Sequence, residues 1–489
     1  MTSASNPKVL FATSEAHPLM KTGGLADVSG ALPAALHAQG VDIKVLLPGY
    51  REVWDKCRHS NTFAVLPNPF GPGDIHLVES TLPGTTLPLL IVAYDAFFNR
   101  DGGPYQMPSG SDWPDNALRF GLLSYVAAWL GSNANTTAWQ PDLVHCNDWQ
   151  TGLAPAYLRF WPGRKAASIM TIHNLAYQGV FGADLVHSLK LPPESFKMQG
   201  LEYYGQLSFL KAGLFYSDRI TTVSPTYARE IQHEALGFGM QGLLSQRRGV
   251  LSGIVNGIDT QEWGPERDPH LPHCYDAKHL GNKALNKAAL QQALGLQAAA
   301  DTPLVAIISR ITYQKGSDVV LGVMHDLVRE GVQFALLGSG DKDQEQAFTK
   351  LAQQNPGRIS VTIGYDEGLS HRIEAGADIF FMPSRFEPCG LNQMYSQRYG
   401  TPPVAHATGG LADTIVDATA HNLAAGSASG ILFYDMHFHS CIAALRHAVQ
   451  LYRLSPDVWK KLQRAGMARD FSWQNSAQEY LKLYRALVA

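Results

Sequence analysis

A glycine-rich hexapeptide, TGGLAD, occurs twice in this chain, at residues 22–27 and again at residues 408–413. Two adjacent glycines let the backbone approach a ligand closely, because no Cβ blocks it. The N–H groups at the start of a following helix favour an anion. One copy alone is also typical of a plain turn beside a solvated lysine, here Lys21. Two copies, one in each half of the chain, favour a diphosphate held by two similar domains.

In the second half, a basic segment could bind such a diphosphate and an acidic segment could bind sugar hydroxyls. Arg310 and Lys315 follow an apolar run, and together they could neutralise a diphosphate leaving group without a metal ion. A solvated basic loop is the alternative. Glu387 follows another apolar run, where its carboxylate could orient sugar hydroxyls or favour the start of a helix. We expect the neighbouring Cys389 to pack rather than to react.

Asp148 and His173 follow two apolar runs in the first half of the chain. Ligands of doubly wound sheets bind beyond the carboxyl ends of the strands, so both side chains could reach the same ligand. The aromatic residues Trp149 and Tyr177 beside them suit the C–H faces of a carbohydrate. A hydrogen-bonded structural histidine is the alternative interpretation of His173.

Neither a metal site nor a cofactor is predicted. The Asp341-Lys342-Asp343 sequence resembles a metal–nucleotide motif, but we interpret it as a polar turn after a glycine-rich stretch. The five cysteines form no C-x-x-C pair and no zinc-like spacing, which indicates reduced thiols. Nicotinamide-linked redox chemistry would require G-x-G-x-x-G after the first strand, and the loop at Lys21 does not supply it.

Composition restricts the class of protein. The chain has 489 residues, 45% of them hydrophobic, which is typical of a packed protein with two or more domains. The net charge of −3 argues against a nucleic-acid partner. No apolar run approaches the ~20 residues of a membrane span, so no membrane partner is expected. The polar segment at residues 1–8 leaves no room for a signal peptide, which predicts a cytoplasmic protein. No pattern predicts an oligomeric state.

Short apolar runs separated by helix-length segments predict two α/β domains, each built on a doubly wound parallel sheet. The predicted strands of the first domain cover residues 9–13, 43–47, 89–93, 143–146, 169–172 and 220–223. Those of the second cover residues 304–309, 334–337, 359–363, 379–382, 404–407 and 431–433. The predicted domains span residues 1–258 and 259–468.

The C-terminal segment, residues 469–489, predicts an amphipathic helix. From Asn475 onward its apolar residues recur at helical spacing, so one face must be buried. We expect that face to pack back onto the N-terminal domain, with packing on the C-terminal domain as the alternative.

Taken together, these motifs resemble the bacterial glycogen synthase and plant starch synthase family. The matching motifs occur in family order and span nearly the whole chain: KTGGLADV, HNLAYQG, SPTYARE, NGID, SRITYQKG, PSRFEPCGL and TGGLADT. The resemblance implies two Rossmann-like domains facing a deep cleft, the GT-B type of glycosyltransferase. It also implies a glycogen synthase that transfers glucose from ADP-glucose to the non-reducing end of an α-1,4-glucan, with retention and without a metal.

The resemblance also implies roles for individual residues. Lys21, Arg310 and Lys315 would hold the diphosphate. Asp148 and Glu387 would hold the glucosyl hydroxyls, with His173 against the reacting sugar. The residues expected to bind the nucleotide or the rest of the donor are Gly23, Gly24, Asp27, Tyr105, Asn256, Tyr365 (by stacking on adenine), Cys389, Gly390, Leu391, Thr408, Gly409 and Gly410.

Two departures qualify the resemblance. Many retaining transferases of this architecture carry a second glutamate eight positions after the first, where this chain has Tyr395. Glycogen synthases share that absence, which discourages a mechanism with paired carboxylates. Tyr204 stands where a relative has asparagine, and this affects the fine detail of substrate contacts. A transferase that uses UDP-glucose and a non-catalytic glucan-binding homologue remain as alternative functions.

Overall fold

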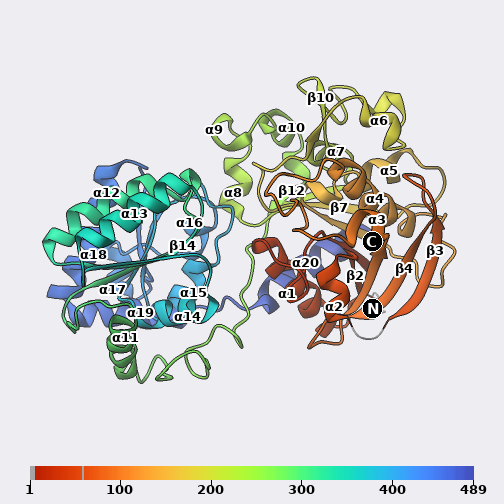
Figure 1. Cartoon of the computed structure of the whole chain (residues 1–489). Helices are drawn as coiled ribbons and strands as arrows, with labels where there is room; N and C mark the ends of the chain where they lie inside the picture. Colours follow the sequence, from red (N-terminus) through yellow and green to blue (C-terminus); the bar gives the residue numbers. More distant parts are fainter. Residues whose placement is uncertain (1–5, 58–59) are drawn as a thin grey trace. The chain divides into compact units, whose positions relative to one another are not determined.

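The structure, a computed structural model, describes residues 6–57 and 60–489. The chain divides into two units. Unit 1 comprises Met1–Gly257 and Trp473–Ala489, and unit 2 comprises Ile258–Ser472 (Figure 1). The prediction that no signal peptide precedes the first strand depends partly on residues 1–5, which lie outside the described residues. Within the described ranges, we find no helix with the length and apolar character that crossing a membrane requires.

Unit 1 is built on a nine-stranded sheet in the order β12-β11-β7-β6-β1-β2-β5-β4-β3. Its strands are β1 (Lys8–Ala12), β2 (Asp42–Pro48), β3 (Asn61–Pro67), β4 (Asp74–Thr81), β5 (Pro88–Ala93), β6 (Leu143–Asn147), β7 (Ala167–Ile172), β11 (Arg219–Thr222) and β12 (Leu251–Gly253). The strands expected from apolar runs pair in parallel, as predicted.

The antiparallel strands β3 and β4 were not predicted. They extend the sheet beyond β5, and neither is continuously buried: β4 alternates between exposed and buried residues in its first half, and β3 has one buried residue, Leu66. Such patterns are typical of antiparallel strands with solvated faces, whereas the predicted strands were continuous apolar runs. A small antiparallel sheet of β8 (Val180–Phe181), β10 (Gln206–Ser208) and β9 (Glu202–Tyr203) was missed because its strands are so short.

The helices of unit 1 include the C-terminal one. They are α1 (Gly24–Ala38), α2 (Arg51–Lys56), α3 (Asp95–Phe98), α4 (Asn116–Leu130), α5 (Ala154–Phe160), α6 (Leu185–Ser188), α7 (Phe209–Tyr216), α8 (Pro225–Glu230), α9 (Glu234–Gly237), α10 (Gln241–Gln246) and α20 (Trp473–Val488). Helix α20 packs against α1, and its residues Trp473, Tyr480 and Tyr484 belong to the hydrophobic core of unit 1.

Unit 2 is built on a six-stranded sheet, in the order β15-β14-β13-β16-β17-β18, in which every neighbouring pair is parallel. Its strands are β13 (Leu304–Ile308), β14 (Gln333–Gly338), β15 (Ile359–Ile363), β16 (Ile379–Met382), β17 (Pro403–His406) and β18 (Ile431–Phe433). Its helices are α11 (Gly281–Ala293), α12 (Ser317–Leu327), α13 (Lys342–Gln354), α14 (Glu367–Gly376), α15 (Asn392–Arg398), α16 (Gly409–Thr414), α17 (Ala420–Ala425), α18 (Phe438–Leu454) and α19 (Pro456–Met467).

Both faces of the unit 2 sheet are covered. Along β13, Val305 and Ile307 belong to one hydrophobic cluster with α12 and α18, while Leu304 and Ala306 belong to another with α11 and α14. Successive side chains of a strand point to opposite faces, so these clusters lie on the two sides of the sheet. Two covered faces explain why these strands are continuous apolar runs.

Each sheet has one topological switch point. In unit 1, β1 lies between β2 and β6, and in unit 2, β13 lies between β14 and β16. Beyond the carboxyl ends of strands at such a point lies the usual ligand crevice of doubly wound sheets. The predicted site residues Lys21, Asp148, Lys315 and Glu387 follow the strands β1, β6, β13 and β16 respectively.

Candidate active site

The glycine loop of unit 1 is held in shape by Glu15, a buried carboxylate just beyond β1. Glu15 accepts hydrogen bonds from the Thr22 N–H (2.5 Å), the Thr22 hydroxyl (2.7 Å) and the Gly23 N–H (3.3 Å). Sequence reasoning passed over Glu15. The signal that could have found it is its position: an ionisable residue directly after a buried strand.

Tyr105 completes this anchor from a distant loop. Its hydroxyl hydrogen-bonds to Ser14 Oγ (2.8 Å) and donates to the Glu15 carboxylate. Burial raises the pKa of Tyr105 well above its usual value, and the charge of Glu15 raises it further, so the phenol stays protonated. Tyr105 was predicted to touch the donor directly. In this structure it holds the carboxylate that shapes the glycine loop.

Lys21 and Asp27 form an ion pair of 2.7 Å on the outside of that loop. Both side chains are partly exposed, so an incoming anion would compete with Asp27 for the ammonium group. A Cβ placed on Gly23 or Gly24 would meet nothing within 4 Å. The backbone of the first TGGLAD copy is therefore open to an approaching ligand on the side where a side chain would project, although the Gly23 N–H is already donated to Glu15.

Asp148 and His173 lie together, at the ends of the neighbouring strands β6 and β7. The Asp148 carboxylate accepts the backbone N–H of His173 at 2.7 Å. Asp148 has φ 53° and ψ −176°. Backbone of this kind costs a non-glycine residue on the order of 1–3 kcal/mol and is found mainly at functional sites. Burial raises the pKa of Asp148 to about 7, although hydrogen bonds from the His173 and Asn174 N–H groups act to lower it.

The imidazole of His173 is neutral and has a fixed orientation. Its surroundings are largely buried, which lowers its pKa to about 3. The Asn147 amide donates to the Ala12 carbonyl at 3.0 Å, so its oxygen faces His173 Nε2 at 2.9 Å. Nε2 must then carry the proton, which leaves Nδ1 as a hydrogen-bond acceptor.

In unit 2, Lys315 forms an ion pair with Glu387. Ser384 Oγ donates to the same carboxylate oxygen at 3.0 Å, and both charged side chains are largely buried. Lys315 ends a 3₁₀ turn after β13, and Gly316 follows it in a left-handed conformation with φ 71°. A Cβ on Gly316 would overlap the Pro383 carbonyl, so glycine is what allows this turn to approach the loop after β16.

Arg310 is exposed in the loop that follows β13. Its guanidinium donates to Gln314 at 3.3 Å, and Gln314 in turn donates to the Phe386 carbonyl at 3.3 Å. The loops after β13 and β16 are thus joined by a short hydrogen-bonded chain beside the Lys315–Glu387 pair.

Arg385 is a second residue that sequence reasoning passed over. It forms two hydrogen bonds of 2.7 Å with the Asp318 carboxylate and one of 2.7 Å with the Tyr313 carbonyl. Its guanidinium also lies over the Tyr313 ring, 3.6 Å from the ring centre. Arg385 therefore fixes the turn that carries Lys315, and its place inside the PSRFEPCGL motif was the available signal.

The second TGGLAD copy differs from the first. The Gly410 N–H was predicted to face a diphosphate, but it already donates to the Glu387 carbonyl (3.1 Å) and the Pro388 carbonyl (3.2 Å). A Cβ on Gly409 or Gly410 would overlap the carbonyl oxygen of Glu387 or Cys389. These glycines let α16 pack against the backbone of the Glu387 loop. In this structure they position that loop. The contact of the Gly410 N–H with a diphosphate stays a prediction, since that N–H is shared here between two backbone carbonyls.

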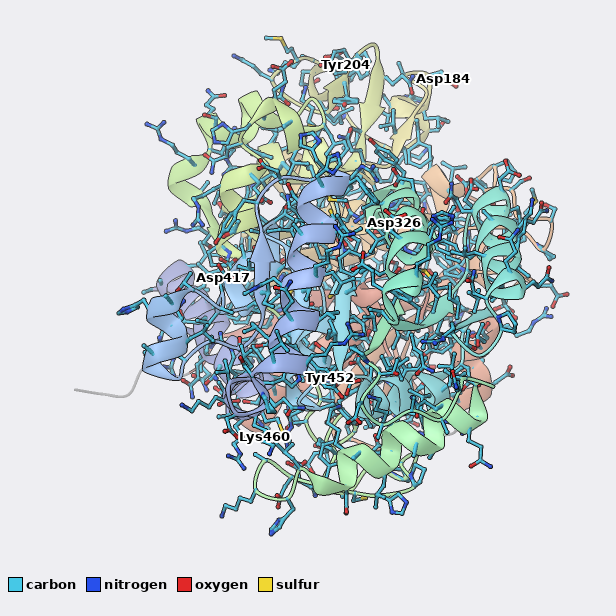
Figure 2. All side chains as sticks on the ribbon, turned by 90° about the vertical axis from the view of Figure 1, so that its left-hand side faces the viewer. Asp184, Tyr204, Asp326, Asp417, Tyr452 and Lys460 are labelled. Carbon is cyan, nitrogen blue, oxygen red and sulfur yellow. The ribbon has the colours of Figure 1, made fainter. Side chains whose placement is uncertain are left out.

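The remaining predicted residues lie in different surroundings. Cys389 and Thr408 are buried, and Gly390 takes a left-handed conformation before Leu391. Asn256, in unit 1, is buried, and its Oδ1 has no hydrogen-bond partner among the described residues. Tyr365 is 73% exposed, and its hydroxyl donates to Glu367. Tyr204, the departure noted above, is also exposed (Figure 2).

The Asp341-Lys342-Asp343 sequence begins a helix. Asp341 was interpreted as part of a polar turn, but its carboxylate accepts the Gln344 N–H at 3.0 Å and caps α13. Capping by aspartate at this position is a usual way to satisfy the first N–H groups of a helix.

Comparison with known proteins identifies the family of both halves. Residues 8–246 match the family described as the starch synthase catalytic domain, and residues 295–432 match glycosyl transferases group 1. The structure is similar to the catalytic domain of starch synthase IV from Arabidopsis thaliana bound to ADP and acarbose, with a TM-score of 0.89 and 32% identity, covering 99% of this chain and 100% of that one. Sucrose-phosphate synthase from Thermosynechococcus elongatus, with a TM-score of 0.59 and 18% identity over 98% of this chain and 99% of that one, shares the fold.

Two curated relatives match along their whole length. The glycogen synthase of Nitrosospira multiformis is 53% identical over 483 residues, which cover 98% of this chain and 97% of the relative. That of Nitrosomonas eutropha is 54% identical over 489 residues, which cover 99% and 97%. The predicted fold class of two Rossmann-like α/β units is confirmed, and the chain belongs to the glycogen synthase and starch synthase family of glycosyltransferases.

Proposed function

We propose that this protein is a glycogen synthase that transfers glucose from ADP-glucose to the non-reducing 4-OH of an α-1,4-glucan, with retention at the anomeric carbon. The observation that carries the proposal is the buried Lys315–Glu387 pair at the switch point of unit 2. It is supported by the name of the full-length relatives and by the ADP and acarbose bound to the Arabidopsis starch synthase. A cytoplasmic location fits this function.

The chemical barrier lies in breaking the bond between the anomeric carbon and the phosphate oxygen. Negative charge then grows on the diphosphate, and we propose that Lys315 and Arg310 stabilise it. We also propose that Lys21, beside the glycine loop of unit 1, binds phosphate. Fixed cations that meet charge as it develops lower the barrier more than they strengthen substrate binding. Because these are side-chain cations, we propose that the transfer needs no metal ion.

The carboxylates and His173 suit the sugar. Glu387 is fixed by Ser384 and Lys315, and it can accept hydrogen bonds from glucosyl hydroxyls. Nδ1 of His173 can accept a hydrogen bond from a further hydroxyl, because Nε2 already donates to Asn147. We propose that the Asp148 carboxyl also forms a hydrogen bond with a sugar hydroxyl, and that its protonation state depends on the bound sugar.

Retention without a paired carboxylate favours attack on the same face that the diphosphate leaves. The bond from the anomeric carbon to the phosphate oxygen breaks, and the bond to the acceptor oxygen forms. The acceptor's hydroxyl proton passes to the departing phosphate oxygen. Trapping a covalent glucosyl adduct on Glu387 or Asp148 would contradict this mechanism.

The direct test is ADP release from ADP-glucose in the presence of glycogen, measured with and without EDTA. We expect glycogen-dependent release that EDTA leaves unchanged. A clear preference for UDP-glucose in the same assay would support the alternative donor. Glycogen binding with no release from either donor would support the non-catalytic alternative.

A further inference from the structure

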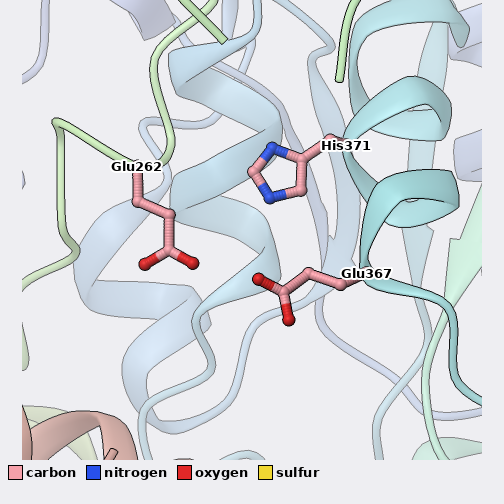
Figure 3. Close-up of side chains that lie close together, drawn as sticks. All are labelled: Glu262, Glu367 and His371. Atoms are coloured by element: carbon pink, nitrogen blue, oxygen red, sulfur yellow. The ribbon is translucent and has the colours of Figure 1, made fainter. Parts of the chain in front are cut away.

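A second cluster of ionisable side chains lies in unit 2, and the proposed function does not use it. Glu262, Glu367 and His371 each offer one potential metal-binding atom, and these three atoms all lie within 4.8 Å of one another (Figure 3). The two carboxylates are half-buried and His371 is buried. None of the three belongs to the predicted diphosphate or glucose contacts.

His371 is held so that one ring nitrogen faces the two carboxylates. Its Nδ1 lies 2.7 Å from the Asp268 carboxylate, and Trp263 stacks on the ring at a centroid distance of 3.8 Å. The opposite nitrogen, Nε2, has no hydrogen-bond partner among the described residues, although the residue is only 1% exposed. Figure 3 shows this nitrogen directed toward Glu262 and Glu367.

Asp268 fixes which nitrogen carries the proton. It is buried and also accepts hydrogen bonds from the Tyr399 hydroxyl and the His270 N–H. A carboxylate partner at Nδ1 makes that nitrogen the donor, so Nε2 presents a lone pair. The same carboxylate–histidine arrangement orients histidine ligands in metalloproteins.

The two glutamates come from different segments. Glu367 and His371 are four residues apart in α14, so they share one face of its first turns. Glu262 comes from the loop that precedes α11. A buried lone pair that faces two carboxylates is costly without a partner, because an unsatisfied polar group loses its hydration.

We propose that Glu262, Glu367 and His371 bind a divalent transition-metal ion such as Zn²⁺. One imidazole nitrogen with carboxylate oxygens suits Zn²⁺, whereas Mg²⁺ prefers oxygen ligands alone. Zinc–ligand bonds of 2.0–2.1 Å in a tetrahedral site place the ligand atoms about 3.3 Å apart. The distances between the three ligand atoms, now within 4.8 Å, would therefore have to shorten by at most about 1.5 Å. The half-buried glutamate side chains can make that movement by rotation. The ion would tie the loop at Glu262 to the start of α14.

The test uses the untagged full-length protein after chelator treatment, with ZnCl₂ as the probe in a calorimetric titration. We expect saturable binding of one ion per chain at micromolar zinc, together with a rise in Tm. Glu262→Gln and Glu367→Gln keep side-chain shape and should each weaken binding at least tenfold, because even loss of an outer partner of a ligand costs ~10–100-fold. Binding of Co²⁺ at the same site should give visible d–d absorption that both variants lose.

The matched control changes an exposed aspartate–histidine pair of unit 2. Asp276 and His279 lie 2.9 Å apart on the surface, so the double variant Asp276→Asn/His279→Gln removes a candidate for non-specific zinc binding. We expect it to bind zinc within threefold of wild type. Absence of saturable binding at micromolar zinc, or equal affinity in wild type and in both glutamate variants, would overturn the proposal. Since zinc binding is measured without substrate, either result leaves the glucosyltransferase assignment intact.

Discussion

Lys315 and Glu387 are the two residues on which the proposed chemistry depends most. Their charges lie in contact, and Ser384 and the backbone at Gly316 fix their positions. A cation placed in advance loses little free energy to reorganisation when the leaving group becomes charged. The structure therefore supports a role for Lys315 in the transition state rather than in substrate binding alone.

We expect Lys315→Ala and Arg310→Ala each to lower turnover with ADP-glucose and glycogen by roughly two or more decades. The loss of one electrostatic donor costs about 3–4 kcal/mol in comparable sites, which corresponds to that change in rate. Steady-state ADP release measures it. The matched control is Lys460→Ala, on the exposed surface of α19 (Figure 2), which should leave turnover unchanged. Rates within threefold of wild type in both site variants would contradict the role.

The buried carboxyl of Asp148 should make the stability of the protein depend on pH. Burial raises its pKa from 3.8 to about 7 in the folded protein, so the folded state binds this proton more tightly than the unfolded chain does. Its contribution to stability is therefore fully present below about pH 4 and is lost as the pH rises through about 7. We expect the unfolding free energy of wild type, relative to Asp148→Asn, to fall by roughly 1 kcal/mol per pH unit across that window.

Urea denaturation curves at several pH values measure this difference. Asp184→Asn changes an exposed aspartate of unit 1 (Figure 2) and controls for the substitution itself. A difference between wild type and Asp148→Asn that stays constant from pH 4 to 7 would show that the carboxyl is not buried in this way.

For single residues, the sequence predicted which side chains lie near one another better than it predicted their individual contacts. Placing candidates at strand ends was enough to bring together Asp148 with His173 and Lys315 with Glu387, because the sheet topology decides which strand ends are neighbours. Identical glycine motifs could not reveal that one loop is open and the other is packed against the Glu387 backbone. That difference depends on tertiary contacts, which six residues of sequence do not encode.

Among the elements, helix α20 has the most informative contacts. The Tyr484 hydroxyl lies 2.7 Å from His145 Nδ1, and His145 Nε2 lies 2.6 Å from Thr171 Oγ1. Burial lowers the pKa of His145 to about 3, so this ring is neutral and depends on both partners. The last helix of the chain is thereby hydrogen-bonded into the centre of the unit 1 sheet.

We expect Tyr484→Phe to lower the unfolding free energy by about 1–3 kcal/mol, because it leaves a buried ring nitrogen without a partner. Urea denaturation should show a lower midpoint with an unchanged slope. The matched control is Tyr216→Phe, since the Tyr216 hydroxyl has no hydrogen-bond partner in the described parts of the chain. An equal effect of the two substitutions would mean that the hydrogen bond to His145 contributes nothing.

The elements themselves were largely predictable where burial is uniform. Strands covered on both faces, such as β13 and β14, are continuous apolar runs, and their bounds agree with prediction to within a residue or two. Strands β3 and β4 are half-solvated, so their signal is weaker. The partner of α20 could not be derived from its amphipathic pattern, because the pattern shows only that one face is buried.

At the scale of the whole molecule, unit 1 is built from two segments that are far apart in the sequence. Unit 2 is one continuous segment inserted within unit 1, and the chain leaves and rejoins unit 1 at neighbouring points. Ile258 N–H donates to the Phe471 carbonyl at 2.8 Å, and a Cβ on Gly257 would lie only 2.7 Å from the Trp473 backbone.

We therefore expect residues 258–472 to fold when expressed alone and residues 1–257 to remain unfolded or aggregated. Unit 1 without α20 loses Trp473, Tyr480 and Tyr484 from its core. Joining residues 1–257 to 473–489 through a short Gly-Ser linker should restore folding, because the two points are adjacent. Near-ultraviolet circular dichroism and cooperative urea unfolding report the outcome. A cooperatively folded 1–257 fragment would show that α20 is dispensable.

The insertion of unit 2 ahead of α20 has a consequence for biosynthesis. At ~5–20 residues per second, a ribosome needs roughly 10–40 s to make residues 258–472 after it has finished the first part of unit 1. During that delay the first segment of unit 1 exposes the apolar surface, including part of α1, that α20 later covers. Residues 1–257 are thus the part of the nascent chain that most needs chaperones, until α20 emerges last and completes the core of unit 1.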